Sequence, residues 1–466
     1  MWLSETIRPV SVSRASYLKR WIVAVGVLAI GSLSVTSGTM AASARASNPV
    51  RALPWGREIQ IAGRGNPGVF TSLSCAARGS CTAVGYWSLI HQFPAPPEGF
   101  IVDETRGKWG TPFVVPGLDA NQLVGSSVTS VSCRAPGTCA AGGSASSPHG
   151  PDGFLVNEKG GVWGDAQLEP GPVEAVSCAT PGNCTAVGGQ TDAQGFVVDE
   201  TNGVWGTAQD VPGLATLSGG SGSYVDLVSC TAIGDCSAAG RFPEGHVFGG
   251  FVVDESHGVW GNAEEVPGFS SLHSIYAGLP MSALSCAGPG DCAAIGNYET
   301  YPDHFGAFVV DESGGIWRVA KMIPGVGALN AVSCWAVARC DAVATAGLPS
   351  GVSSGVVVEE RAGRWGHAHQ IPGLLALVRG GSILPTTISC DSTGDCAAGG
   401  VDGGSANFIV DKVGGIWHDA AIVRNGDGQS TIVTCLAGDH CVVATDAYKP
   451  VETGEVASGP ILPRPR

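Results

Sequence analysis

Eight copies of one cysteine-bearing segment predict an all-β chain, an eight-bladed β-propeller with four antiparallel strands in each blade. Two cysteines stand six positions apart in every copy, and the first cysteines follow one another at intervals of 45 to 58 residues. A tryptophan with glycine two positions before it recurs once in each interval. Short β-rich runs separated by Gly- and Pro-containing turns fill the intervals, and four such runs are the strand content of a propeller blade.

The third copy illustrates the expected strands, which are residues 175–178, 184–189, 195–200 and 204–212. Trp55 stands alone before the first cysteine pair, whereas the last pair has no tryptophan after it. We therefore expect a strand around Trp55 to complete the last blade, since a closed ring leaves no sheet edge exposed. A linear β-solenoid is the alternative, but a split repeat and uneven intervals favour the ring.

All sixteen cysteines belong to these pairs, and each pair brackets the turn between the first two strands of its unit. Cysteines that face each other across the mouth of a hairpin can reach disulfide distance. A zinc site is disfavoured because each pair offers two thiolates where zinc takes four ligands, and redox sites use C-x-x-C spacing. We expect no metal and no cofactor. The expected disulfides are Cys75–Cys81, Cys133–Cys139, Cys178–Cys184, Cys230–Cys236, Cys286–Cys292, Cys334–Cys340, Cys390–Cys396 and Cys435–Cys441.

The first 44 residues differ from the remainder of the chain. Basic residues up to Arg20 precede a 15-residue apolar run, and Ala42-Ser43-Ala44 fits a cleavage site, so 1–44 is predicted to be a secretory signal peptide. An uncleaved membrane anchor is the alternative, although a spanning helix needs about 20 apolar residues. Residues 45–459 would then form an extracellular propeller followed by a disordered tail, 460–466. Regularly paired cysteines agree with an oxidising compartment.

Composition narrows the classes of partner. The 466 residues are 44% hydrophobic, too apolar for a disordered chain. The formal net charge of −15 argues against nucleic acid and anionic membrane surfaces, because both require basic patches. We expect a monomer with no transmembrane domain once the signal peptide is cleaved.

Acidic doublets recur before each Gly-x-Trp. Paired carboxylates suggest a glycosidase, but recurrence in every unit favours a structural role in which Asp or Asn at a turn accepts backbone N–H groups. Tryptophan is expected to pack between neighbouring blades. The doublets are Asp103-Glu104, Asp199-Glu200, Asp254-Glu255 and Asp311-Glu312, with variants Asn157-Glu158, Glu359-Glu360 and Asp411-Lys412.

This hairpin resembles the Asp-box of sialidases and related propellers, in which Asp, Gly and Trp mark a turn between outer strands. The resemblance covers only the hairpin of each unit and implies a propeller blade. Glycine stands two residues before tryptophan in this chain, one fewer than in the Asp-box. No catalytic residue is therefore carried over from it.

Antiparallel strands send their loops to alternate ends of a blade. The cysteine turns and the Asp-Glu turns should share one face, called the uniform face here, and the longer loops should share the opposite, variable face. Tyrosines concentrate in the variable loops, and their rigid, half-polar rings suit recognition. The predicted ligand-binding residues are Tyr86, Trp87, Tyr224, Tyr276, Tyr298, Tyr301 and His304.

Three functions remain open. The first is a secreted propeller that binds an extracellular glycan, a cell-wall component or a protein through the variable face. The second is a glycan-active hydrolase or lyase at the propeller mouth, with arginines that clamp an anionic substrate. The third is a purely structural module. The acids considered for the second are Asp152, Asp226, Glu244 and Asp303, and the arginines are Arg241, Arg379 and Arg424.

Overall fold

The structure is a computed structural model. It describes residues 59–60, 68–87, 97–118, 125–147, 150–190, 193–245, 247–272, 280–300, 304–348, 352–377, 382–403, 406–425, 431–437, 440–445 and 455–460. The chain divides into two parts, residues 1–49 and 50–466, and every described residue belongs to the second. The expected signal peptide and residues 461–466 of the expected tail lie outside the described residues, so both stay predictions.

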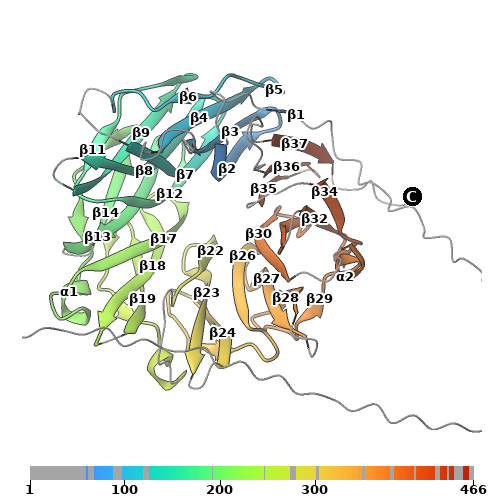
Figure 1. The fold of residues 1–466 in the computed structure, drawn as a ribbon. Coiled ribbons are helices and arrows are strands. Elements are labelled where there is room, and N and C mark those ends of the chain that lie inside the picture. The colour runs from blue at the N-terminus through green and yellow to red at the C-terminus, as the bar shows by residue number, and fades with distance from the viewer. Residues whose placement is uncertain are drawn as a thin grey trace, which may run out of the picture. The chain divides into compact units, whose positions relative to one another are not determined.

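The described part is an all-β structure built of repeated antiparallel hairpins (Figure 1). We number the repeat units one to eight by their cysteine pairs. Their first strands are β2 (Gly68–Ala77), β7 (Gly125–Ala135), β12 (Val173–Thr180), β17 (Ser223–Ala232), β22 (Ala283–Gly288), β26 (Ala328–Ala336), β30 (Ile383–Cys390) and β35 (Thr431–Leu436). The second strands are β3 (Ser80–Trp87), β8 (Thr138–Ser147), β13 (Asn183–Gln190), β18 (Asp235–Glu244), β23 (Asp291–Thr300), β27 (Arg339–Gly347), β31 (Cys396–Asp402) and β36 (His440–Thr445).

The third strands run back alongside the second strands. They are β4 (Glu98–Thr105), β9 (Gly150–Lys159), β14 (Ala193–Thr201), β19 (Val247–Ser256), β24 (His304–Asp311), β28 (Ser353–Glu359), β32 (Ala406–Val413) and β37 (Glu455–Pro460). Short helical turns α1 (Leu214–Leu217), η2 (Phe269–Leu272) and α2 (Leu374–Leu377) follow the fourth strands of three units.

The fourth, outermost strand of the units differs from the single continuous strand that the sequence predicts. In the third unit two short pieces replace it, at 204–205 and 209–210, and they pair with different parts of β14. Between the pairs Glu200–Trp205 and Phe196–Asp210, the outer strand has one residue more than β14, which is the geometry of a β-bulge. The short strands at this position are β5 (Lys108–Trp109), β6 (Phe113–Val114), β10 (Val162–Trp163), β11 (Gln167–Glu169), β15 (Val204–Trp205), β16 (Gln209–Asp210), β20 (Val259–Trp260), β21 (Glu264–Glu265), β25 (Lys321–Met322), β29 (His369–Gln370), β33 (Ile416–Trp417) and β34 (Ala421–Asn425).

The two ends of the described chain meet in one sheet. β1 (Ile59–Gln60) pairs with β37, so a segment before the first cysteine pair completes the sheet of the eighth unit (Figure 1). Trp55 itself lies outside the described residues. The first strands of successive units lie against one another, and β2 lies against β35. The described strands form seven sheets, because β13 and β17 join the third and fourth units into one, and the count of eight blades stays a prediction.

All eight expected disulfides are present. In the third unit Cys178 lies directly opposite Cys184, and the turn between them contains Gly182 with a φ of 72°. The N–H of Gly203, in the Asp-Glu turn, donates to the carbonyl of Gly182 at 2.7 Å. A Cβ on Gly182 would lie 2.9 Å from that nitrogen, so both backbone conformation and close approach require glycine. This contact places both turns on the uniform face, as predicted.

In the first seven units, a serine hydroxyl directly before the first cysteine joins the unit to the next one. The Ser177 hydroxyl accepts a hydrogen bond from the Cys230 N–H at 2.9 Å, and the Ser333 hydroxyl accepts one from the Cys390 N–H at 3.0 Å. The N–H of the next unit's first cysteine donates in the same way to the hydroxyls of Ser74, Ser132, Ser229, Ser285 and Ser389. Most adjacent units share no sheet, so these side-chain hydrogen bonds connect their strands.

A second set of bonds joins the units nearer the outer strands. The Trp163 Nε1–H donates to Asp103 of the preceding unit at 2.9 Å, and Trp317 donates to Asp254 at 2.9 Å. Trp205, Trp260, Trp365 and Trp417 make the same contact with the preceding unit. The expectation that these acids accept backbone N–H groups of their own turn was wrong, because their side chains point to the neighbouring unit.

No helix among the described residues is long and apolar enough to cross a membrane.

We predict that Ser333→Ala lowers the stability by about 1–2 kcal/mol, because the Cys390 N–H loses its acceptor in a partly buried position. The urea midpoint of unfolding measures this effect. Ser313→Ala is the matched control, since Ser313 is exposed. Equal midpoints for the two variants would contradict the role of the hydroxyl.

Candidate functional site

The predicted binding residues do not form one patch in the described structure. Tyr86, Tyr224 and Tyr298 lie in strands β3, β17 and β23 rather than in loops, because the hairpins are longer than expected. Trp87 is 3% exposed and packs on Phe100 with 4.8 Å between ring centroids, so it belongs to the core. Tyr276 and Tyr301 lie outside the described residues, and His304 begins β24. The ligand-binding role of all seven stays a prediction.

An open cleft of about 700 Å³ lies between the fifth and sixth units toward the variable face. Its walls come from the β23–β24 hairpin, the segment before β26, and the ends of β27 and β28. Phe305 is 67% exposed and forms one wall. The polar lining consists of Asn297, Thr345 and Ser353, and backbone groups of 325–328 complete it. An exposed aromatic ring beside polar groups is typical of a binding site.

The register of the hairpin decides which side chains face this cleft. Asn297 stands opposite Ala307, and Tyr298 stands opposite Gly306. Successive side chains point to opposite faces of a strand, so Tyr298 lies on the other face of the hairpin from Asn297. Its hydroxyl lies 2.9 Å from the Met322 sulfur. Phe305, which sequence reasoning missed, is therefore the aromatic residue of the cleft. It lies two residues before Ala307, the partner of Asn297, and no sequence motif marks it.

A charged cluster marks the variable-face end of the third and fourth units. Four residues before the first cysteine, most units carry Thr, Ser or Asn, as in Thr71 and Ser282, whose hydroxyls donate to backbone carbonyls of the next unit. The third and fourth units carry Glu174 and Asp226 instead. Asp226 forms an ion pair of 3.1 Å with Arg241.

This cluster unites residues that the sequence had suggested separately. The Arg241 guanidinium lies 4.4 Å from the Tyr224 ring centroid. Burial raises the pKa of Asp226 to about 7, Arg241 acts against that shift, and Glu174 adds to it. Burial also raises the pKa of Glu174. Asp152 and Glu244 lie elsewhere in β9 and β18, Arg424 lies in β34, and Asp303 and Arg379 lie outside the described residues.

Carboxyl groups meet across the boundaries between units on the uniform side. Glu158 of the second unit faces Asp103 of the first, and burial together with the Asp103 charge raises the pKa of Glu158 to about 7. Glu360 is raised to about 7 in the same way, by burial and then by Asp311 and Asp291. These acids recur from unit to unit, which argues against reading any one pair as a catalytic site.

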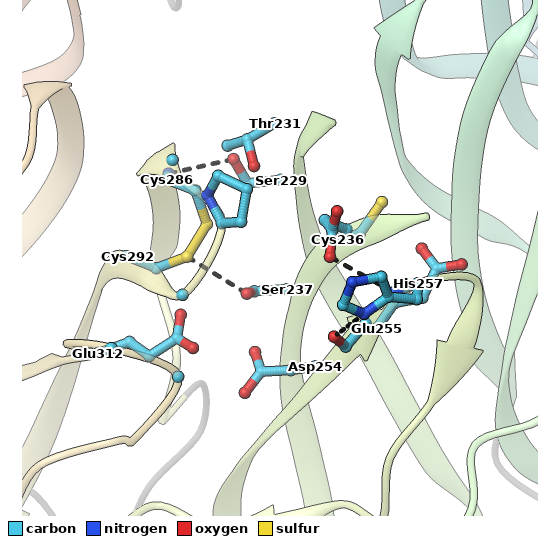
Figure 2. A pocket seen from close by; sticks show the side chains of 17 residues that line it. Ser229, Thr231, Cys236, Ser237, Asp254, Glu255, His257, Cys286, Cys292 and Glu312 are labelled. Carbon is cyan, nitrogen blue, oxygen red and sulfur yellow. Dashed lines mark hydrogen bonds between the residues drawn. A yellow bond between two sulfur atoms is a disulfide. The ribbon is translucent and has the colours of Figure 1, made fainter. Parts of the chain in front are cut away.

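The boundary between the fourth and fifth units holds a cavity of about 530 Å³. Asp254 and Glu312 extend from the two units toward each other beside Ser237 (Figure 2). The only described group of three potential metal ligands within 4.8 Å is Asp341 with Cys390 and Cys396. These cysteines are joined in a disulfide, so they offer no thiolate to a metal.

No family model and no curated protein matches the chain. A protein of unknown function from Dyadobacter fermentans DSM 18053 is 10% identical over 88% of this chain and 100% of its own, with a TM-score of 0.42. The Cps50 (Swd1) β-propeller domain of Myceliophteria thermophila is 10% identical over 70% of this chain and 94% of its own, with a TM-score of 0.41. A PL25 polysaccharide lyase, an ulvan lyase bound to -[GlcA(1-4)Rha3S]-, is 8% identical over 86% of this chain and 95% of its own, with a TM-score of 0.46. No function follows from likenesses of this size, and the Asp-box resemblance stays a hypothesis.

We predict that Glu158→Gln stabilises the protein at pH 8 relative to the parent chain, by on the order of 1–2 kcal/mol once solvent screening reduces the full effect of the pKa shift. A carboxyl group with a raised pKa binds its proton more tightly in the folded state, so its effect on stability worsens as pH rises from 4.5 to about 7. The difference between variant and parent should therefore grow across this window and level off above it.

Urea midpoints at several pH values measure this difference. The exposed Asp210→Asn is the control, because an exposed carboxylate contributes little to stability. A Glu158→Gln effect that is constant from pH 4 to pH 8 would exclude the pKa explanation.

Proposed function

We propose that this protein is an extracellular binding propeller that recognises a glycan in the cleft between its fifth and sixth units. The observation that supports the proposal is Phe305, an aromatic side chain 67% exposed beside hydroxyl and amide groups. An aromatic ring offers a flat apolar surface for the C–H face of a sugar ring, and the polar groups offer partners for its hydroxyls. Eight disulfides suit an oxidising, extracellular compartment.

The backbone around the cleft favours a flat ligand. Gly325 has a φ of 78° and open space where a Cβ would stand, so a sugar ring can approach the main chain there. A volume of about 700 Å³ lies within the range of small-molecule sites, which is roughly 300–1,000 Å³. Asn297 is held in place by hydrogen bonds with both the N–H and the carbonyl of Leu329, so this wall of the cleft is preorganised.

A glycan-active lyase or hydrolase is a second candidate, favoured by the Glu174, Tyr224, Asp226 and Arg241 cluster. An arginine can neutralise an acidic sugar, and a buried carboxyl group with a pKa near 7 suits proton transfer. Polysaccharides containing uronic acids are the substrates to assay. New reducing ends that are lost in Asp226→Asn but not in Phe305→Ala would favour this candidate.

For the binding proposal, we predict that Phe305→Ala weakens glycan binding at least tenfold, about 1.4 kcal/mol, through loss of the stacking surface. A glycan and cell-wall array followed by titration calorimetry measures the loss. Val337→Ala is the control, since Val337 is equally exposed at 67% but stands in a cysteine turn of the uniform face. Absence of any glycan ligand, or equal affinity of the two variants, would contradict the proposal.

A further inference from the structure

The boundaries between units differ in how they neutralise one shared position. This position is the second residue of each acidic doublet. Its side chain meets the first doublet residue of the preceding unit, which accepts the tryptophan N–H. Between the sixth and seventh units Lys412 occupies it, and its Nζ lies 2.8 Å from Asp341 and 2.9 Å from Glu359. Lys412 is only 1% exposed. The chain therefore places a cation of its own between two carboxylates there.

The boundary between the second and third units uses a neutral donor. The Asn157 Nδ2 donates to Glu200 at 2.7 Å, while Trp205 donates to the Asn157 Oδ1 at 2.9 Å. Lys159 and Arg134 line the groove at the same boundary. Between the fifth and sixth units, Lys321 lies 3.4 Å from Asp311. Each of these boundaries supplies a donor or a positive charge from the chain.

Among the residues that line its cavity, the boundary between the fourth and fifth units offers hydroxyls but no side-chain amide. Asp235, Asp254, Glu255 and Glu312 line it, with His257 and without lysine or arginine. Its volume of about 530 Å³ exceeds those of the cavities at the second–third boundary, about 20 and 290 Å³, and at the fifth–sixth boundary, about 270 Å³. Room and negative charge therefore coincide at this boundary.

Two carboxylate oxygens there lack a partner. Glu312 is 3% exposed, and its Oε2 makes no hydrogen bond, nor does the Oδ1 of Asp254. Trp317 donates to the other Asp254 oxygen. Ser237, which lies beside both acids, has a single hydroxyl proton and cannot serve both. A buried carboxylate oxygen without a partner is costly, and Figure 2 shows both carboxylates directed into the shared space.

We propose that the groove between the fourth and fifth units binds a divalent, oxygen-preferring cation, Ca²⁺ in the extracellular setting, between Asp254 and Glu312. Carboxylate and hydroxyl oxygens are the ligands that Ca²⁺ prefers, and water completes a shell of six to eight oxygens. The cation takes the position that the Lys412 ammonium holds two boundaries farther on. It joins the two units by their carboxylates, apart from the variable-face cleft.

Calcium titration of the chelator-treated full chain tests the proposal. We expect calorimetric binding with a Kd of about 0.1–1 mM and a rise in melting temperature that saturates with the same constant. Glu312→Gln should weaken binding at least tenfold. Glu200→Gln is the matched control, because it changes the same repeat position at a boundary where Asn157 and Lys159 serve the acid.

A gain-of-charge variant makes the test independent of loss of folding. Glu312→Lys copies Lys412 and should raise the melting temperature without calcium while abolishing the calcium response. The proposal is overturned if wild type shows no calcium response at pH 7.5, since the two acids then share a proton. It is overturned equally if NaCl of matched ionic strength gives the same shift, or if Glu312→Gln binds calcium as wild type does.

Discussion

Each unit from the second to the eighth turns the N–H of its first cysteine toward the preceding unit, where a serine hydroxyl accepts it. Most neighbouring units share no sheet, so their polar backbone groups would otherwise stay unsatisfied at the boundary. The serine before each cysteine answers that requirement in seven successive boundaries. The disulfide beside it ties the two strands of the same hairpin, and the position of the serine depends on that hairpin.

The tryptophan bonds add a second requirement at the outer strands. An indole N–H that enters a buried boundary needs an acceptor, and an acid of the preceding unit supplies it to five of the six tryptophans. That acid is then buried, so its charge or its proton must be balanced in turn. At the second–third boundary the Asn157 amide replaces that acid, and at the sixth–seventh boundary the Lys412 ammonium pairs with it. One structural bond thus makes the electrostatics of the uniform side sensitive to pH.

The turns of the uniform face are constrained by hydrogen bonds to each other, whereas the loops of the variable face differ in length and sequence. The uniform face repeats because two turns hydrogen-bond to each other in each of six units, where a longer loop would break the contact. On the variable face, some described residues depart from the repeat. Glu174 and Asp226 replace hydroxyl-bearing residues, and Phe305 is exposed at a cleft. Rigid scaffolds with variable loops commonly divide stability and recognition in this way.

The sequence by itself determined the all-β class, the local disulfides and the side of the molecule that repeats. These depend on residues close in the chain, such as Cys178 and Cys184 six positions apart, and on patterns that recur. The partners of the tryptophans lie 48 to 63 residues away in another unit, so only the tertiary structure assigned them. The cleft was decided in the same way. A shift of one residue in the β23–β24 register would exchange Tyr298 and Asn297 between faces, and the sequence does not fix that register.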